Sequence, residues 1–278
     1  MDRAYSQVDV FTENPFMGNP VAVVLEADGL SEEQMQAIAR WTNLSETTFV
    51  FPPAHAAADY RLRIFTPSSE IPFAGHPTLG SAWALLESGL KPKKTGTLVQ
   101  ECAKGQVELR TGEGKIFLKL PEPVFIEAKE HELHLAAQAL GIDRSHILNS
   151  EHVDVGPVWF LLQLPSAQEV LALRPDMEQV SALEGITGIT VFGLHPDGKY
   201  EIRSFAPAFG VPEDPVCGSG NGCVAALIRR KGLISASNYT ALQGRCLGRD
   251  GKVEIEYDDD IWVGGKAVVR INGKIRSE

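Results

Sequence analysis

Two halves of this chain repeat each other, and this repeat limits the possible architectures more than any other feature of the sequence. Arg63-Ile64-Phe65-Thr66-Pro67 matches Arg203-Ser204-Phe205-Ala206-Pro207, which lies 140 residues later (203 minus 63). Three further matches keep the same order at spacings near half of the 278-residue length: residues 19–21 with 156–158, 47–51 with 188–192, and 76–82 with 214–220. Ordered matches at one spacing predict two homologous halves that face each other.

Each half shows the same mixture of local patterns. β-branched and aromatic stretches predict strands at 20–25, 47–51 and 60–65, and again at 157–164, 189–194 and 200–205. Ser31 with Gln34, and Ser166 with Glu169, fit the capping box that begins a helix. The apolar, small-residue segments 77–86 and 218–228 predict one buried helix in each half. We therefore expect an α/β (α+β) fold of two pseudo-symmetric halves, each a mostly antiparallel sheet wrapped around a central helix.

The boundary between the halves is expected at Leu120-Pro121-Glu122-Pro123, where two prolines end a strand-like segment. This gives an N-terminal half of residues 1–121 and a C-terminal half of residues 122–278. The run 262–271 predicts a last strand, which can pack back on the first half.

Charge and composition exclude several classes of partner. The chain has 26 Lys+Arg against 36 Asp+Glu, a net charge of -10, so its surface should repel nucleic acid. No apolar run approaches the roughly 18 residues of a membrane span, and the first residues lack the pattern of a signal peptide. The four cysteines form no CxxC pair and are too sparse for a disulfide framework. We expect a cytoplasmic protein with neither a nucleic-acid nor a membrane partner.

Two PxxGS segments, at 77–81 and 215–219, are predicted to begin the central helices. Backbone N–H groups at a helix N-terminus attract anions. If the halves face each other, both helix ends point into one cleft, which would suit a small carboxylate. His76 and Asp214, which the repeat places at matching positions, would meet there.

Two threonines separate Glu46 from the strand-like Phe49-Val50-Phe51, so Glu46 is expected at a strand end. Partial burial there would raise the pKa of its carboxyl group toward neutral, as a general acid/base requires. The second half has Ile186-Thr187 at this place, so the predicted site is asymmetric.

Four segments together resemble the PhzF-like phenazine biosynthesis protein family. They are Gly18-Asn19-Pro20-Val21-Ala22-Val23, Leu44-Ser45-Glu46-Thr47-Thr48-Phe49-Val50, Phe73-Ala74-Gly75-His76-Pro77-Thr78-Leu79-Gly80 and Glu213-Asp214-Pro215-Val216-Cys217-Gly218-Ser219-Gly220. The resemblance implies a diaminopimelate epimerase-like fold, a homodimer, and a biosynthetic isomerase that needs neither metal nor organic cofactor.

In that family a glutamate moves a proton between ring carbons of trans-2,3-dihydro-3-hydroxyanthranilate, and Glu46 matches this glutamate. The resemblance also implies that His76 and Asp214 orient and balance the charge of a small anionic substrate. It assigns substrate binding to Ser219 with the Gly75 and Gly218 backbone, and Asn19 and Ser45 to the lining of the site.

Cys217 departs from the phenazine pattern, because Cys-Gly-Ser-Gly also presents one of the two catalytic thiols of diaminopimelate epimerase. A thiol at a helix N-terminus should have a lowered pKa. The repeat places Leu79, not a second cysteine, at the matching position. Cys217 can be a small packed residue or a substrate-binding residue in a Glu46 isomerase, or it can share the proton transfer with Glu46 as a single thiol. An epimerase or racemase that uses Cys217 and a non-catalytic small-ligand-binding protein also stay open.

Two other motifs predict no cofactor site. The run Gly218-Ser219-Gly220-Asn221-Gly222-Cys223 lacks the third glycine of a dinucleotide fingerprint. His131 and His134 lie three residues apart without a third ligand, so no metal is expected.

Overall fold

The computed structural model describes residues 1–277, and these divide into two compact units. The first unit comprises Met1–Lys119 and the residues from Gly264 onward, and the second unit comprises Leu120–Val263. The division thus falls after Lys119, where the sequence placed it after residue 121. In the described chain, no helix combines the length and the apolar character needed to cross a bilayer.

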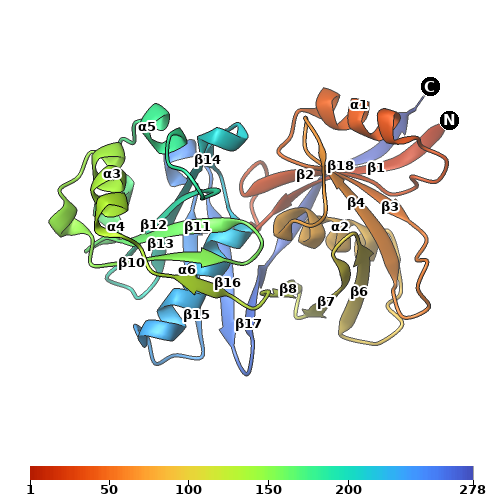
Figure 1. Ribbon diagram of the computed structural model, residues 1–278. Helices are drawn as coiled ribbons and strands as arrows, with labels where there is room; N and C mark the ends of the chain where they lie inside the picture. Colours follow the sequence, from red (N-terminus) through yellow and green to blue (C-terminus); the bar gives the residue numbers. More distant parts are fainter. Residues whose placement is uncertain (278) are drawn as a thin grey trace. The chain divides into compact units, whose positions relative to one another are not determined.

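The first unit is discontinuous because strand β18 (Ala267–Arg276) returns to strand β1 (Asp2–Val10). The two strands pair antiparallel from Asp2 with Arg276 to Val10 with Ala267. Figure 1 shows the blue β18 beside the red β1.

One mixed sheet runs through the first unit in the order β18-β1-β2-β3-β4-β6-β7-β8, and the short β5 pairs with the end of β4. The pairs β2–β3 and β4–β6 are parallel and the others are antiparallel. The strands are β2 (Asn19–Val24), β3 (Thr47–Phe51), β4 (Tyr60–Phe65), β5 (Glu70–Ile71), β6 (Thr97–Cys102), β7 (Gly105–Gly112) and β8 (Lys115–Lys119).

Two helices of the first unit pack on opposite faces of this sheet. Helix α1 (Glu32–Thr42) begins at the predicted Ser31–Gln34 capping box and packs in the cluster that contains Phe49 and Phe65. Helix α2 (Gly75–Glu87) contacts the other face, where its Ser81 hydroxyl lies 2.8 Å from the Thr48 hydroxyl. Because α2 is buried along most of its length, it is the central helix that the sequence predicts.

The second unit repeats this plan. Its sheet has the order β9-β10-β11-β12-β13-β15-β16, with β14 on the end of β13 and with β11–β12 and β13–β15 parallel. The strands are β9 (Val124–Ile126), β10 (Asn149–Asp154), β11 (Val158–Gln163), β12 (Gly188–Leu194), β13 (Tyr200–Ala206), β14 (Val211–Asp214), β15 (Asn238–Gln243) and β16 (Gly251–Tyr257), and β17 (Ile261–Gly265) reaches the boundary of the unit.

The second unit has its central helix, α6 (Gly218–Lys231), on one face of the sheet. The other face packs against shorter helices in a separate apolar cluster. These helices are α3 (Glu130–Leu140), α4 (Ala167–Ala172) and α5 (Met177–Ser181). Three 3-10 turns follow α3, β13 and β15: η1 (Arg144–His146), η2 (Pro207–Phe209) and η3 (Arg245–Leu247). The predicted fold class is therefore confirmed: each unit is a sheet around a central helix.

The strands show how the two units correspond residue by residue. Arg63 and Arg203 hold the same place in β4 and β13, and they pair across the sheet with Phe49 and Val191. Phe49 thus corresponds to Val191, one residue beyond the match predicted from sequence. A slip of one residue exchanges the two faces of a strand, so the predicted register of this strand was wrong.

The central helices show a larger error in the predicted alignment of the two halves. Gln100 of β6 donates to Thr78 of α2, and Gln243 of β15 accepts from Asn221 of α6. Both pairs are 143 residues apart (221 minus 78 and 243 minus 100), which makes Ser219 the counterpart of His76.

The predicted match of His76 with Asp214 was therefore wrong by five residues. The PxxGS segments misled it because Pro77 is the third residue of α2, whereas Pro215 lies before α6 begins. In the corrected register the counterpart of Cys217 is Ala74, not Leu79. These two residues are the N-caps of the central helices.

Candidate active site

Glu46 and His76 come together in the first unit. Glu46 directly precedes β3, and His76 is the second residue of α2, the central helix of this unit. Glu46 Oε2 lies 3.4 Å from His76 Nε2, and only 16% of the Glu46 side chain and 7% of the His76 side chain are exposed. The two predicted catalytic groups of this unit therefore form a pair at the N-terminus of its central helix.

The surroundings of Glu46 make its carboxyl group suitable for proton transfer. Burial raises its pKa from 4.5 to about 7, and the hydrogen bond from the Ser45 side chain opposes this rise. Oε2 accepts no hydrogen bond from residues 1–277. A carboxyl group with a pKa near neutral can both take and return a proton under ordinary conditions.

The other predicted residues of the first unit lie at element ends. Asn19 is buried at the start of β2, and Gly75 is the first residue of α2. Ser45, predicted to line the site, contacts the Glu46 carboxylate directly.

Asp214, Cys217, Gly218 and Ser219 come together around the start of α6. Asp214 ends β14, and its Oδ1 accepts the backbone N–H of Val216 at 3.0 Å, so it shapes the turn that leads into the helix. The N-cap of α6 is Cys217, whose sulfur accepts the N–H of Gly220 at 3.3 Å.

The lowered pKa expected of a thiol at a helix N-terminus is not found at Cys217. Burial raises the pKa of this thiol well above its usual value, and the nearby Asp214 charge raises it further. The sulfur is enclosed because Cys217 is buried, so the position at a helix N-terminus does not decide its ionisation.

Ser219 is held by a residue that sequence reasoning missed. The indole Nε1 of Trp159, in β11, donates a hydrogen bond of 3.0 Å to Ser219 Oγ. The Cys217 sulfur lies 3.5 Å from the same oxygen. Trp159 is 4% exposed, and an apolar strand context gave no signal that its ring faces a polar residue.

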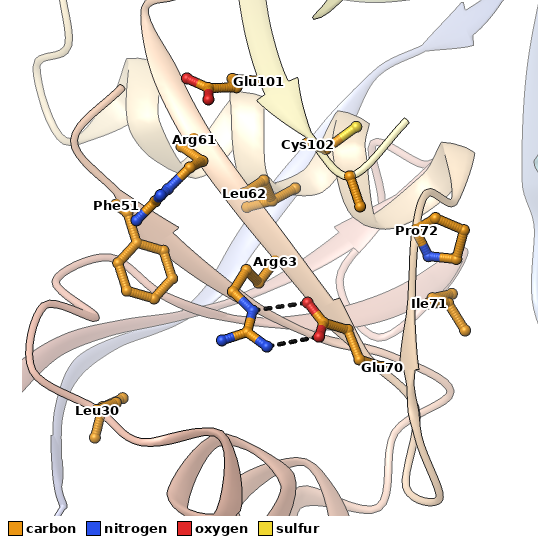
Figure 2. A pocket seen from close by; sticks show the side chains of 11 residues that line it. Leu30, Phe51, Arg61, Leu62, Arg63, Glu70, Ile71, Pro72, Glu101 and Cys102 are labelled. Carbon is orange, nitrogen blue, oxygen red and sulfur yellow. Dashed lines mark hydrogen bonds and ion pairs between the residues drawn. The ribbon is translucent and has the colours of Figure 1, made fainter. Parts of the chain in front are cut away.

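An arginine–glutamate clamp precedes each central helix and was also missed. Arg63 binds Glu70 through Nε at 2.7 Å and Nη2 at 2.6 Å, as the dashed lines in Figure 2 show. Arg203 binds Glu213 in the same way, at 2.9 and 2.8 Å. The signal was present in the sequence, because each arginine lies in the repeated Arg-x-Phe-x-Pro segment.

The hollow shown in Figure 2 is lined in part by Arg63 and Glu70 of the first clamp. Its volume is about 430 Å³, and its lining includes Phe51, Arg61 and Cys102 but none of the predicted site residues. Phe51 belongs to the α1 face of the sheet, opposite the face that carries α2. Within residues 1–277, no group of three or more His, Cys, Asp or Glu side chains is arranged to hold a metal ion.

Comparisons with known proteins show which family this chain is similar to. Residues 8–274 match the family model described as phenazine biosynthesis-like protein. The chain is 42% identical to "Antisense-enhancing sequence 1" of Schizosaccharomyces pombe, with 98% of each chain covered. It is 38% identical to the trans-2,3-dihydro-3-hydroxyanthranilate isomerase of Pseudomonas chlororaphis, over 88% of this chain and 87% of that protein.

A solved structure shows the same architecture. The crystal structure of a Bacillus anthracis phenazine biosynthesis protein of the PhzF family matches with a TM-score of 0.87 and 26% identity, and 99% of each chain is covered. Several relatives carry the name isomerase. The chain therefore belongs to the phenazine biosynthesis-like protein family, and it is an isomerase.

Proposed function

We propose that this isomerase moves a proton between carbon atoms of a small carboxylate substrate, without a cofactor, and that Glu46 is its general acid/base. The observation that supports this most strongly is the buried Glu46 carboxyl group, with a pKa raised to about 7, beside His76. The substrate class follows the Pseudomonas chlororaphis relative, whose name specifies trans-2,3-dihydro-3-hydroxyanthranilate.

Glu46 acts in two steps. Its carboxylate removes a proton from one carbon, and the electron pair of that C–H bond delocalises into the adjoining unsaturated system. The resulting Glu46 carboxylic acid returns the proton to another carbon, which gives an enol and restores the carboxylate. The enol becomes a ketone in a separate tautomerisation, in which its O–H proton is lost and a ring carbon gains a proton. His76, 3.4 Å away, orients the substrate and balances the charge that develops between the two steps.

Residues of the second unit are assigned substrate-binding roles in this proposal. Asp214 orients the substrate, and Ser219 and the Gly218 backbone hold its carboxylate at the start of α6, where free N–H groups favour an anion. Asn19, Ser45 and Gly75 complete the binding surface. Cys217 packs beside Ser219 and caps the helix, and the raised pKa of its thiol argues against a proton-transfer role.

The test follows the fate of the substrate proton. NMR of the protein with trans-2,3-dihydro-3-hydroxyanthranilate in D₂O should show loss of substrate and deuterium at a ring carbon. Glu46→Gln should lower kcat by about 10²–10⁴-fold, the usual contribution of a general acid/base. Glu108→Gln, an exposed substitution in the same unit, is the matched control and should turn over normally.

Two further measurements separate this function from its rivals. A saturated substrate analogue should bind equally to the unaltered protein and to Glu46→Gln, because the carboxyl group acts on the proton. Cys217→Ala should retain turnover, whereas its inactivation would favour the epimerase-like use of the thiol. Binding of the analogue without any turnover or deuterium uptake by the unaltered protein would favour the ligand-binding protein.

A further inference from the structure

Trp159 occupies the place in the second unit that the Glu46 carboxyl group occupies in the first. The corrected register makes Gly188, at the start of β12, the counterpart of Glu46, just as Ser219 is the counterpart of His76. The first unit therefore places an acid beside a histidine, and the second has a glycine and a serine at the corresponding positions.

The space left at Gly188 is filled by the indole of Trp159. Trp159 and Gly188 are paired neighbours on β11 and β12. A Cβ atom at Gly188 would lie 3.0 Å from the Trp159 ring and 2.1 Å from the Phe205 carbonyl oxygen. Position 188 thus has no room for a side chain, and the Trp159 ring lies against the Gly188 backbone.

The hydrogen bond from the Trp159 indole limits which hydrogen bonds the Ser219 hydroxyl can make. A serine hydroxyl has one proton to donate and two lone pairs to accept with. Trp159 Nε1 has only a proton to donate, so its 3.0 Å bond occupies one lone pair of Ser219 Oγ. The Ser219 proton is left to be donated. Among residues 1–277, its acceptor in hydrogen-bond range is the weakly accepting Cys217 sulfur, 3.5 Å away.

We propose that Trp159 is a positioning residue that directs the Ser219 hydroxyl proton toward the substrate carboxylate. A carboxylate oxygen is a stronger acceptor than the Cys217 sulfur. When substrate binds, the Ser219 hydroxyl therefore donates to the carboxylate instead of the sulfur, and its hydrogen bond from the indole stays in place. This inference rests on the proposed role of Ser219 in holding the substrate, and it gives the buried tryptophan a task besides packing.

A double-mutant cycle tests it. The probe is 3-hydroxyanthranilate, an aromatic carboxylate that has no proton to transfer between ring carbons. Trp159→Phe and Ser219→Ala should each raise its Kd about tenfold, the size expected for a hydrogen bond to a charged group. Trp159→Phe in the Ser219→Ala background should add less than about twofold, because the tryptophan acts through the serine.

The matched control is Trp262→Phe. Trp262 is also buried in the second unit, and its Nε1 donates to Asp258 at 3.1 Å. This variant should leave the Kd of the probe unchanged. In the substrate assay, Trp159→Phe should raise KM more than it lowers kcat, because Glu46 is untouched.

A second measurement needs no tryptophan substitution and no turnover. In ¹⁵N-labelled protein, Ser219→Ala should shift the indole N–H resonance of Trp159, and Ser219→Thr, which keeps a hydroxyl, should restore it. Additive losses of binding free energy in the double-mutant cycle would overturn the positioning role. An indole N–H resonance that does not shift in Ser219→Ala would also overturn it. Loss of the proposed Glu46 function alone would leave both results unchanged, so the two proposals fail separately.

Discussion

The two units share one framework but use it for different chemistry. Each has the same strand order, and in each a glutamine reaches a side chain of the central helix. At the start of that helix, the first unit presents His76 beside Glu46, and the second presents Ser219 beside Trp159. The comparison shows that the framework tolerates exchange of the groups at the helix N-terminus, because strand pairing and the buried helix hold the fold without them.

The arginine–glutamate clamp also differs between the units. Arg203 and Glu213 are 6% and 9% exposed, and Arg203 donates further hydrogen bonds to the carbonyl groups of Val170 and Leu173. Arg63 and Glu70 are 29% and 31% exposed, and Arg63 is shared with Glu32 of α1. The same pair is therefore a buried structural joint in one unit and a partly hydrated one in the other.

The largest expected effect comes from breaking the two clamps separately. Arg203→Met should lower the free energy of unfolding by about 3–5 kcal/mol, because it leaves the Glu213 charge buried without its partner. Arg63→Met should cost about 1 kcal/mol or less, because water replaces the lost partner of Glu70. Urea unfolding of both variants measures the difference.

The double variant Arg203→Met with Glu213→Leu is the control for this comparison. Removing both charges should recover part of the loss, since the unpaired buried charge causes most of it. Equal losses for Arg203→Met and Arg63→Met would show that burial does not distinguish the clamps.

The next effect concerns the pH dependence that Glu46 gives to the first unit. Its pKa is raised to about 7, so between about pH 4.5 and 7 the folded protein binds this proton more tightly than the unfolded chain does. The contribution of Glu46 to stability should therefore be largest below this range and fall as the pH rises through it, by at most about 3 kcal/mol.

Glu46→Gln removes this titration and should be more stable than the unaltered protein at pH 8 but not at pH 4. Thermal unfolding across this pH range, with Glu108→Gln as the control, gives the measurement. A difference between the proteins that is the same at pH 4 and pH 8 would contradict the raised pKa.

The smallest effect concerns the thiols. Cys246 is exposed and Cys102 is half-buried, whereas Cys217 and Cys223 are buried with raised pKa values. Iodoacetamide at pH 8 should label the first two at least about tenfold faster than the last two, because the thiolate is the reacting form. Peptide mass spectrometry reads the order of labelling, and early labelling of Cys217 would revive its candidacy as a base.

The sequence was sufficient for the architecture because repeated patterns average over many residues. Strand-like segments, the Ser31 cap and the two apolar helices all came from local composition and periodicity. It was insufficient for register, where matching Pro-Gly-Ser punctuation paired His76 with Asp214 instead of Ser219. Proline, glycine and serine indicate turns, and the position of the turn relative to the start of the central helix differs between the units.

The site shows the same boundary. Glu46, His76, Asp214 and Ser219 stand in short motifs that can be read in one dimension. The contact between Trp159 and Ser219 joins residues 60 positions apart, and the burial that raises the pKa of the Cys217 thiol depends on the packing around it. Neither effect leaves a trace in local sequence.

The return of β18 to β1 sets an order of events when the chain is made on a ribosome. All of the second unit, Leu120–Val263, emerges before β18 does, so it can complete its sheet while the first unit still lacks an edge strand. During that interval the free edge of β1 is open to pairing with other chains. The unit whose translation begins first is thus the last to complete its sheet. The edge of β1 stays exposed to aggregation until β18 emerges and pairs with it.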